Sequence, residues 1–193
     1  EFALAQVVPA LEVFRQQQPQ LNIHLSTSST HADLISERFD LAIRLGRMHD
    51  SNLRAVQLST FEIFAVAAPG LVERFAPVVT LATLESMPTL GHGRVPELTV
   101  TDPAGTEHFY QPKPGTTAIV ADNSATLRAF ALTGQGVAIL PQWLIQDDLD
   151  AGRLQRLLVD YRFAQQGVYA LYPDTRHLPL KVRAFIDFMK GWG

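Results

Sequence analysis

A short apolar run that ends at a glycine, residues 41–45 followed by Gly46, constrains the fold more than any other stretch. The residues before it, 30–37, are polar and read as a short helix. An apolar run of this length between a helix and a glycine is typical of a buried parallel strand. Arg44 interrupts the run near its carboxyl end, which is where ligands bind in open α/β sheets.

The composition favours a packed domain and argues against several functions. The chain has 193 residues, of which 47% are hydrophobic, enough for one large domain or two small lobes. Its net charge of −3 argues against gripping nucleic acid unaided, which usually needs a basic face. The chain has no cysteine, and so neither a disulfide framework nor a thiolate metal site. No apolar run approaches the roughly 20 residues of a membrane span, and no signal peptide is recognisable.

Helix-like and strand-like patterns alternate along the chain. The expected strands are residues 21–26, 41–45, 56–58, 61–67, 89–92, 98–101, 107–110, 117–121, 137–140, 154–159 and 168–172. The expected helices are residues 4–15, 30–37, 71–75, a part of 78–87, 125–133, 141–149 and 179–189. This order predicts an α/β fold with a parallel-rich sheet and helices on both faces.

A hydroxyl-rich loop, residues 26–30, joins the strand expected at its start to the next helix. Ser26 and Thr27 open the loop, and Thr30 with Asp33 forms a weak capping box. A strand, a hydroxyl loop and a helix N-terminus together make a site for an anion or a polar ligand. The same hydroxyls serve equally well as helix caps alone, and the sequence leaves both roles open.

Four segments, in this order along the chain, together resemble the effector-binding domain of LysR-type transcriptional regulators. They are LEVFRQQQP at 11–19, RFDLAIRLG at 38–46, ALTGQGVAILP at 131–141, and the closing run from Tyr172 and Pro173 through residues 177–188. The resemblance covers nearly the whole chain. It implies two Rossmann-like lobes joined by two crossover strands, a fold similar to periplasmic binding proteins of type 2.

The resemblance also implies an organisation and a function. Lobe I would be residues 1–62 plus 167–193 and lobe II residues 63–166, with crossovers near 61–64 and 163–167. A small-molecule effector in the cleft between the lobes would modulate transcription by a cytoplasmic, bacterial-type regulator that is a homodimer or homotetramer. DNA would be bound only through a winged helix-turn-helix domain, and neither membrane nor cofactor is involved. The chain does not begin with Met, so we expect that domain and the first strand of lobe I to lie upstream.

The expected ligand-binding residues share one position, at the carboxyl end of a strand or at the start of a helix. They are Ser26, Thr27, Arg44, Gly46, His92, Asn123, Ser124 and Pro141. Hydroxyls and helix N-termini donate hydrogen bonds and Arg44 adds charge, so a small anion such as a carboxylate is the favoured guest. Two alternatives stay open: Arg44 pairs structurally with Asp40 or Glu37, and His92 is a plain loop histidine.

No catalytic or metal-binding constellation is recognisable in the sequence. The two glycines of residues 134–136 follow a helix and precede a strand, the reverse of a dinucleotide fingerprint. No histidine pair has zinc-site spacing, and no G-x-S-x-G elbow occurs. Asp147, Asp148 and Asp150 read as a solvated helix face. We therefore expect no enzyme, catalytic residue or metal; the alternative function is a transporter's solute-binding protein, which shares the fold and should carry a secretion signal.

The resemblance further implies a symmetric dimer of two antiparallel domains. Residues 4–15 and 21–25 of one chain would face residues 124–133 of its partner, and this isologous contact would occur twice. The apolar stripe of the first helix should serve its own lobe. The expected interface residues are therefore Gln6, Ala10 and Ala129.

Overall fold

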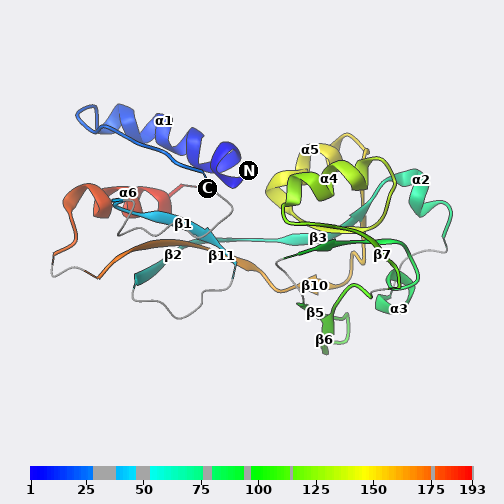
Figure 1. The fold of residues 1–193 in the computed structure, drawn as a ribbon. Helices are drawn as coiled ribbons and strands as arrows, with labels where there is room; N and C mark the ends of the chain where they lie inside the picture. The colour runs from blue at the N-terminus through cyan, green and yellow to red at the C-terminus, as the bar shows by residue number, and fades with distance from the viewer. Residues whose placement is uncertain are drawn as a thin grey trace. The chain divides into compact units, whose positions relative to one another are not determined.

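A computed structural model of the chain describes residues 1–27, 38–46, 53–75, 80–93, 97–113, 115–174 and 177–192. The helix expected at 30–37 and the end of the hydroxyl loop lie outside these ranges. By its internal contacts the chain divides into two compact units (Figure 1). The terminal unit consists of Phe2–Phe61 and Gln166–Gly193, and the central unit of Glu62–Gln165 with Glu1. The lobe limits expected from the sequence stay a prediction.

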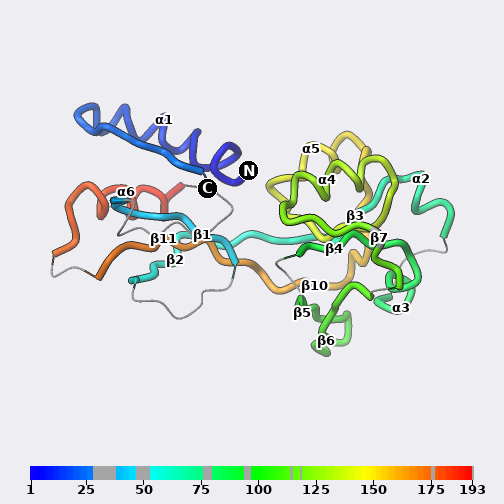
Figure 2. Tube along the Cα trace, viewed as in Figure 1, coloured from blue at the N-terminus to red at the C-terminus, as the bar shows by residue number. Residues whose placement is uncertain are grey.

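The terminal unit combines an antiparallel sheet with three helical elements, of which the π-helical η1 continues directly into α1; Figure 2 traces their path. Its elements are η1 (Ala3–Val7), α1 (Val8–Gln17), β1 (Ala42–Leu45), β2 (Leu53–Phe61), β11 (Gln166–Pro173) and α6 (Leu180–Lys190). The strand order is β1-β11-β2, and β11 runs antiparallel to both neighbours. Helix α1 packs on α6 through Phe14, whose ring meets that of Phe185 edge-on with 5.3 Å between centroids. The α/β class expected from the sequence is confirmed, but the expected parallel-rich sheet is not found in this unit, where both described strand pairs are antiparallel.

The first helix divides its apolar residues between two faces. Val7, Ala10 and Phe14 are buried, and Ala10 belongs to the terminal unit's core cluster. Leu4 is 73% exposed and Val8 42% exposed, on the opposite side. The expectation that Ala10 contacts a partner while Leu4 serves its own lobe is therefore wrong. The helical period turns Leu4 and Val8 outward together, since they lie four residues apart.

Two segments of this unit, residues 41–45 and 21–26, differ from the strands that the sequence predicts. The strand at residues 41–45 exists as β1, but its partner β11 is antiparallel and its residues are not fully buried. Residues 21–26 form no strand, and Ile23 and Leu25 are exposed. A strand requires a neighbour for its N–H and C=O groups. Among the described strands none pairs with this segment, so its alternating apolar side chains are left at the surface.

The central unit contains most of the strands. Its elements are β3 (Ile63–Ala67), α2 (Pro69–Val72), α3 (Leu81–Leu84), β4 (Thr89–His92), β5 (Leu98–Thr101), β6 (Glu107–Tyr110), β7 (Thr117–Ala121), α4 (Ser124–Leu132), β8 (Ala138–Pro141), α5 (Gln142–Asp150), β9 (Gln155–Leu157) and β10 (Arg162–Phe163). Strand β4 runs parallel to β7, and Thr89 makes a parallel bridge to Val137 just before β8. Strand β3 pairs antiparallel with β8 and β9. No helix in the described ranges is long and apolar enough to cross a bilayer.

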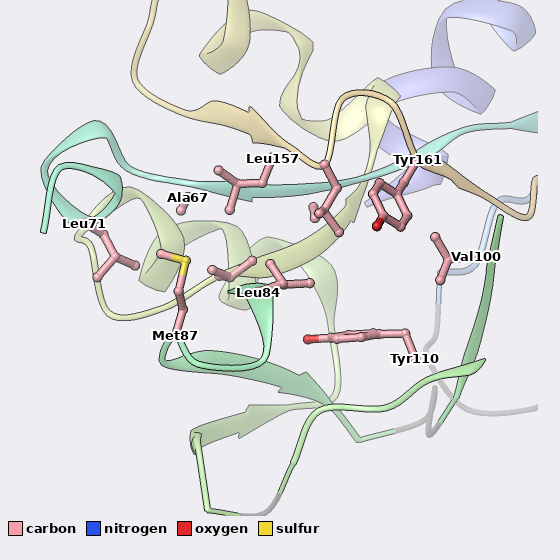
Figure 3. Packing of buried hydrophobic residues seen from close by; sticks show 11 residues of the cluster. Ala67, Leu71, Leu84, Met87, Val100, Tyr110, Leu157 and Tyr161 are labelled. Carbon is pink, nitrogen blue, oxygen red and sulfur yellow. The ribbon is translucent and has the colours of Figure 1, made fainter. Parts of the chain in front are cut away.

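Strand β3 separates two hydrophobic clusters, because all five of its residues are buried. Ala65 and Ala67 belong to the cluster of Figure 3, which also contains Leu84 and Tyr110. Alternate residues of β3 pack on the other side, against the buried faces of α4 and α5. Burial raises the pKa of Tyr110 to about 12. A strand buried on both faces explains the continuous apolar sequence of β3.

The hairpin expected from the turn residues is confirmed. Strands β5 and β6 pair antiparallel, with Thr101 opposite Glu107. The Asp102 carboxylate accepts hydrogen bonds from the N–H groups of Ala104 and Thr106, at 2.9 and 2.8 Å. These bonds hold the turn between the strands, as an Asx-type turn does.

The two glycines of residues 134–136 have separate structural roles. Gly134 has φ +72°, a backbone conformation that favours glycine, just after α4. A Cβ at Gly136 would lie 3.0 Å from the Pro88 carbonyl oxygen and 3.1 Å from Leu90. The spacing that resembles part of a nucleotide-binding motif therefore reflects a helix end and a close backbone approach.

Gly136→Ala should lower the free energy of unfolding by about 1–3 kcal/mol, because the new methyl group overpacks a site bounded by backbone. Urea denaturation of both proteins measures the difference. Gly70→Ala is the matched control: it lies in helix α2 with nothing within 4 Å of the added Cβ. That control should be neutral or stabilise by up to about 1 kcal/mol. Equal effects of the two substitutions would contradict the close-approach explanation.

Candidate functional site

Four of the expected ligand-binding residues lie at one edge of the central unit. His92 ends β4, Asn123 and Ser124 follow β7, and Pro141 ends β8. The ends of β4 and β7 are held together, since His92 pairs with Ala121 and the Gly93 N–H donates to the Ala121 carbonyl at 2.8 Å. We call this edge, His92 with residues 123–125 and Pro141, the central edge. The structure thus brings together residues that are almost 50 positions apart in the chain.

Helix α4 begins at the central edge with defined hydrogen bonds. Asn123 is the N-cap, and its side-chain oxygen accepts from the Thr126 N–H at 2.8 Å. The Ala125 N–H donates to the Glu1 carboxylate, also at 2.8 Å, within the same unit. A helix N-terminus attracts negative charge, and here it already accommodates a carboxylate. Asn123 therefore has a structural use, whereas the N–H groups beside it are suited to an anion.

Helix α5 begins at the same edge without a side-chain cap. Pro141 is its N-cap residue, with φ −61° and ψ 136°. The next N–H, of Gln142, donates to the Glu62 carbonyl at 2.9 Å. Pro141 is buried and has no N–H group, so it offers a ligand no hydrogen-bond donor.

The remaining expected residues lie in the terminal unit. Arg44 and Gly46 are at the carboxyl end of β1, and Gly46 has φ +87°. The Gly46 N–H donates to the Gly167 carbonyl at 2.9 Å, which fixes the strand end to β11. Ser26 and Thr27 are exposed at the end of the first described range, and the structure does not bring them into a described contact with Arg44. We call Arg44 and Gly46 the terminal edge.

The sequence offers two acidic residues, Asp40 and Glu37, as structural partners of Arg44. The Asp40 carboxylate accepts from Lys181 at 2.6 Å, an ion pair between exposed side chains. Glu37 lies outside the described residues. Arg44 is half-buried and takes part in an interaction of its own.

One aspartate of α5 contradicts the sequence expectation. Asp148 is fully buried, whereas Asp147 and Asp150 are exposed as expected. Its carboxylate accepts hydrogen bonds from the guanidiniums of Arg128 on α4 and Arg153 beyond α5. Burial by itself raises the pKa of Asp148, but the two guanidiniums outweigh burial and hold that pKa below its usual value. Sequence reasoning missed this cluster because Arg128 lies 20 residues before Asp148 on another helix and Arg153 lies beyond the end of α5, so the three residues share no periodic pattern.

Metal coordination finds no support in the described ranges, where no group of three or more His, Asp or Glu side chains converges. The groups at the two edges are of kinds that can bind a ligand. The central edge supplies helix N–H donors and the terminal edge supplies a guanidinium. Both kinds of group hold anions, and neither is a nucleophile with an adjacent base.

Comparisons with known proteins agree with one another. The LysR substrate binding domain family matches residues 1–193. The HTH-type transcriptional regulator PtxR of Pseudomonas aeruginosa is 34% identical over 182 residues, which is 92% of this chain and 56% of that protein. The transcriptional activator AmpR of Rhodobacter capsulatus is 31% identical over 190 residues, 98% of this chain and 63% of that protein.

Solved structures of regulatory domains are also similar to this chain. The regulatory domain of AphB from Vibrio vulnificus has a TM-score of 0.78 and 26% identity, covering 99% of this chain and 94% of that one. The CrgA regulatory domain from Neisseria meningitidis, at 24% identity and a TM-score of 0.79, shares the fold over 98% of this chain and 93% of that one. This chain matches 94% and 93% of the lengths of the two regulatory domains, and spans only 56% and 63% of the two regulators above. The chain belongs to the LysR substrate binding domain family.

Proposed function

We propose that this chain is the effector-binding and oligomerisation domain of a cytoplasmic LysR-type transcriptional regulator. The observation that carries the proposal is the family match over all 193 residues. The relatives are named transcriptional regulators and are longer than this chain, which supports DNA binding by another part of the full protein. A solute-binding protein of a transporter shares the fold, but the relatives named above are regulators.

The proposed ligand is a small anion that the protein binds and releases without converting it chemically. We assign to it the central edge, the terminal edge and the hydroxyls of Ser26 and Thr27. The support is the N-terminus of α4, where the Ala125 N–H already binds the Glu1 carboxylate, and the guanidinium at the end of β1. For such a ligand to regulate, it must bind two arrangements of the protein with different affinities.

The proposed oligomer is a symmetric dimer built on the exposed side of α1. Leu4 of η1 and Val8 of α1 are exposed on this side. Beside them lies an open groove lined by Val8, Leu11, Glu12, Arg15, Ile23 and Leu25. Exposed apolar side chains gathered beside a groove favour a protein contact. We propose that this groove meets helix α4 of a second copy, where Ala129 is exposed.

The proposed function assigns specific DNA binding to a part of the full-length regulator outside residues 1–193. Residues 1–193 alone should not bind DNA specifically, because the net charge is −3 and no described helix pair forms a recognition motif. The full-length regulator should bind its promoter with strong salt dependence. Gel-shift titrations of both proteins on the same DNA make the comparison. Specific, salt-sensitive binding by residues 1–193, or none by the full-length protein, would refute the proposed division of labour.

A further inference from the structure

Tyr169, which no sequence pattern singles out, lies beside the terminal edge. It is on β11, directly opposite Arg44 on β1. Side chains directly opposite each other in an antiparallel pair project from the same face of the sheet. The neighbours of Tyr169 in sequence, Val168 and Ala170, are 1% and 0% exposed and project into the core. Arg44 and Tyr169 therefore share the face opposite the core, and both are partly exposed.

The ring of Tyr169 is held in a defined place by Gly167. A Cβ at Gly167 would lie 2.3 Å from the ring's Cε2, 2.6 Å from Cζ and 2.6 Å from the phenol oxygen. The ring thus occupies the volume that the side chain of any other residue at 167 would need. Glycine here makes a notch, and the phenol end of Tyr169 lies in it.

The notch is tied to the terminal edge. The Gly167 carbonyl accepts from the Gly46 N–H at 2.9 Å, and Leu45 pairs with Val168 just before it. The phenol of Tyr169 therefore points along β11 toward the level at which β1 ends in Gly46. The pairing of β1 with β11 thus places the Arg44 guanidinium, the Tyr169 ring and the end of β1 near one another, although Arg44 and Tyr169 are about 125 positions apart in the chain.

These groups have complementary binding properties. A guanidinium binds a carboxylate with charge-assisted hydrogen bonds, and an aromatic ring prefers another ring in an offset or edge-on arrangement. Together they fit a planar molecule that carries a carboxylate on an aromatic ring. An aliphatic anion would use only the guanidinium, and a neutral aromatic molecule only the ring.

We propose that Tyr169 is an effector-contacting residue, positioned by Gly167, and that with Arg44 it makes the terminal edge selective for an aromatic carboxylate. The inference rests on the proposed function and names the ligand class of the same site. A competing explanation is structural, because an aromatic side chain that covers a glycine also stabilises a sheet. Ligand selectivity distinguishes the two roles.

The test uses benzoate as probe, with benzamide and acetate as matched analogues that lack the charge or the ring. The 193-residue chain, labelled with ¹³C on its four tyrosines, is titrated to about 10 mM and followed by NMR. We expect benzoate to shift the Tyr169 ring signals, identified by their loss in Tyr169→Phe. Benzamide and acetate should bind at least about tenfold more weakly than benzoate.

The variants test the geometry. Arg44→Gln should weaken benzoate binding at least about tenfold, as should Gly167→Ala, which displaces the ring. Tyr169→Leu keeps an apolar side chain but removes the ring, and it should also weaken benzoate binding. Tyr172→Phe is the control, since Tyr172 lies on the same strand but packs against the core cluster, and it should bind benzoate as the wild type does. Circular dichroism establishes that each variant is folded before it is titrated.

Three results would overturn the inference: no benzoate binding, shifts that spare Tyr169, or equal binding of benzoate by wild type and Tyr169→Leu. In the last case a lower melting temperature of Tyr169→Leu would assign the ring to structure alone. The proposed function is tested separately by the DNA gel-shift titrations, because these involve no benzoate. A full-length regulator that binds its promoter while the chain ignores benzoate would leave the proposed function standing and refute only the role of Tyr169.

Discussion

Replacing both arginines that pair with Asp148, as Arg128→Met and Arg153→Met, should lower the free energy of unfolding by about 3–5 kcal/mol. The double variant leaves a fully buried carboxylate without the two guanidiniums from which it accepts hydrogen bonds. Because Arg128 is on α4, Asp148 on α5 and Arg153 beyond it, the cluster holds the two helices of the central edge together. Urea denaturation followed by circular dichroism measures the loss.

Two further variants identify the cause. Asp148→Asn removes the buried charge together with its ionic hydrogen bonds, and should cost less than the double variant, about 1.5–3 kcal/mol. Asp150→Asn, at an exposed position of the same helix, should stay within about 0.5 kcal/mol of the wild type. If the double variant is as stable as Asp150→Asn, the cluster does not stabilise the central unit.

The cluster also predicts a pH dependence. The guanidiniums hold the pKa of Asp148 below its ordinary value in the folded state. Its contribution is therefore complete above the unfolded pKa, about 3.9, and is lost as the pH falls through the lower folded value. The stability difference between wild type and Asp148→Asn should be constant from about pH 5 to 8 and shrink below about pH 4. A difference that instead grows on acidification would contradict this assignment.

Val8→Asp should weaken the proposed dimer by about 30- to 1,000-fold, corresponding to about 2–4 kcal/mol. Val8 lines the groove beside α1 and is 42% exposed, so a carboxylate there must be desolvated when a second copy binds. Sedimentation equilibrium over the micromolar range measures the dissociation constant for both proteins.

Leu180→Asp provides the matched control, since Leu180 is an exposed apolar residue of the same unit on α6, outside the groove. This variant should dimerise as the wild type does. Equal dissociation constants for Val8→Asp and wild type would exclude the groove from the interface. A wild-type chain that remains monomeric at tens of micromolar would count against the dimer itself.

Elements with strong local signals were predictable from the sequence. The strands at 98–101 and 107–110 have the predicted limits, since the turn from Asp102 to Gly105 fixes the hairpin between them. Helix α4 lies within a residue of its expected limits because Asn123 caps it and Gly134 follows its end. Such signals act over a few residues, so a single sequence contains them.

The errors concern properties that depend on partners outside the element itself. The apolar run of β1 suggested a parallel strand, but its direction is set by β11, more than 120 residues later. Residues 21–26 alternate like a strand, yet a strand also requires a neighbour. Asp148 looked solvated because neither arginine partner is recognisable from its position on the helix.

The candidate site was partly predictable for the same reason. The rule that ligands bind at the carboxyl ends of strands selected His92, Asn123 and Pro141, and the structure places all three at one edge. It could not select Tyr169, which is in the middle of β11 and reaches the terminal edge only because Gly167 has no side chain. Their roles in ligand binding stay predictions.

Equilibrium dialysis of the 193-residue chain against a bacterial small-molecule extract, followed by mass spectrometry of the retained compounds, measures whether the chain binds a small effector. We expect a small anion to be retained in stoichiometric amount and recovered chemically unchanged, and we expect Arg44→Gln not to retain it. Ser26→Ala should weaken its binding by roughly 0.5–1.5 kcal/mol, or up to about 3 kcal/mol if the acceptor is charged, with a smaller change in stability. Retention of no compound, or recovery of a converted product, would contradict the assignment of this chain as an effector-binding domain.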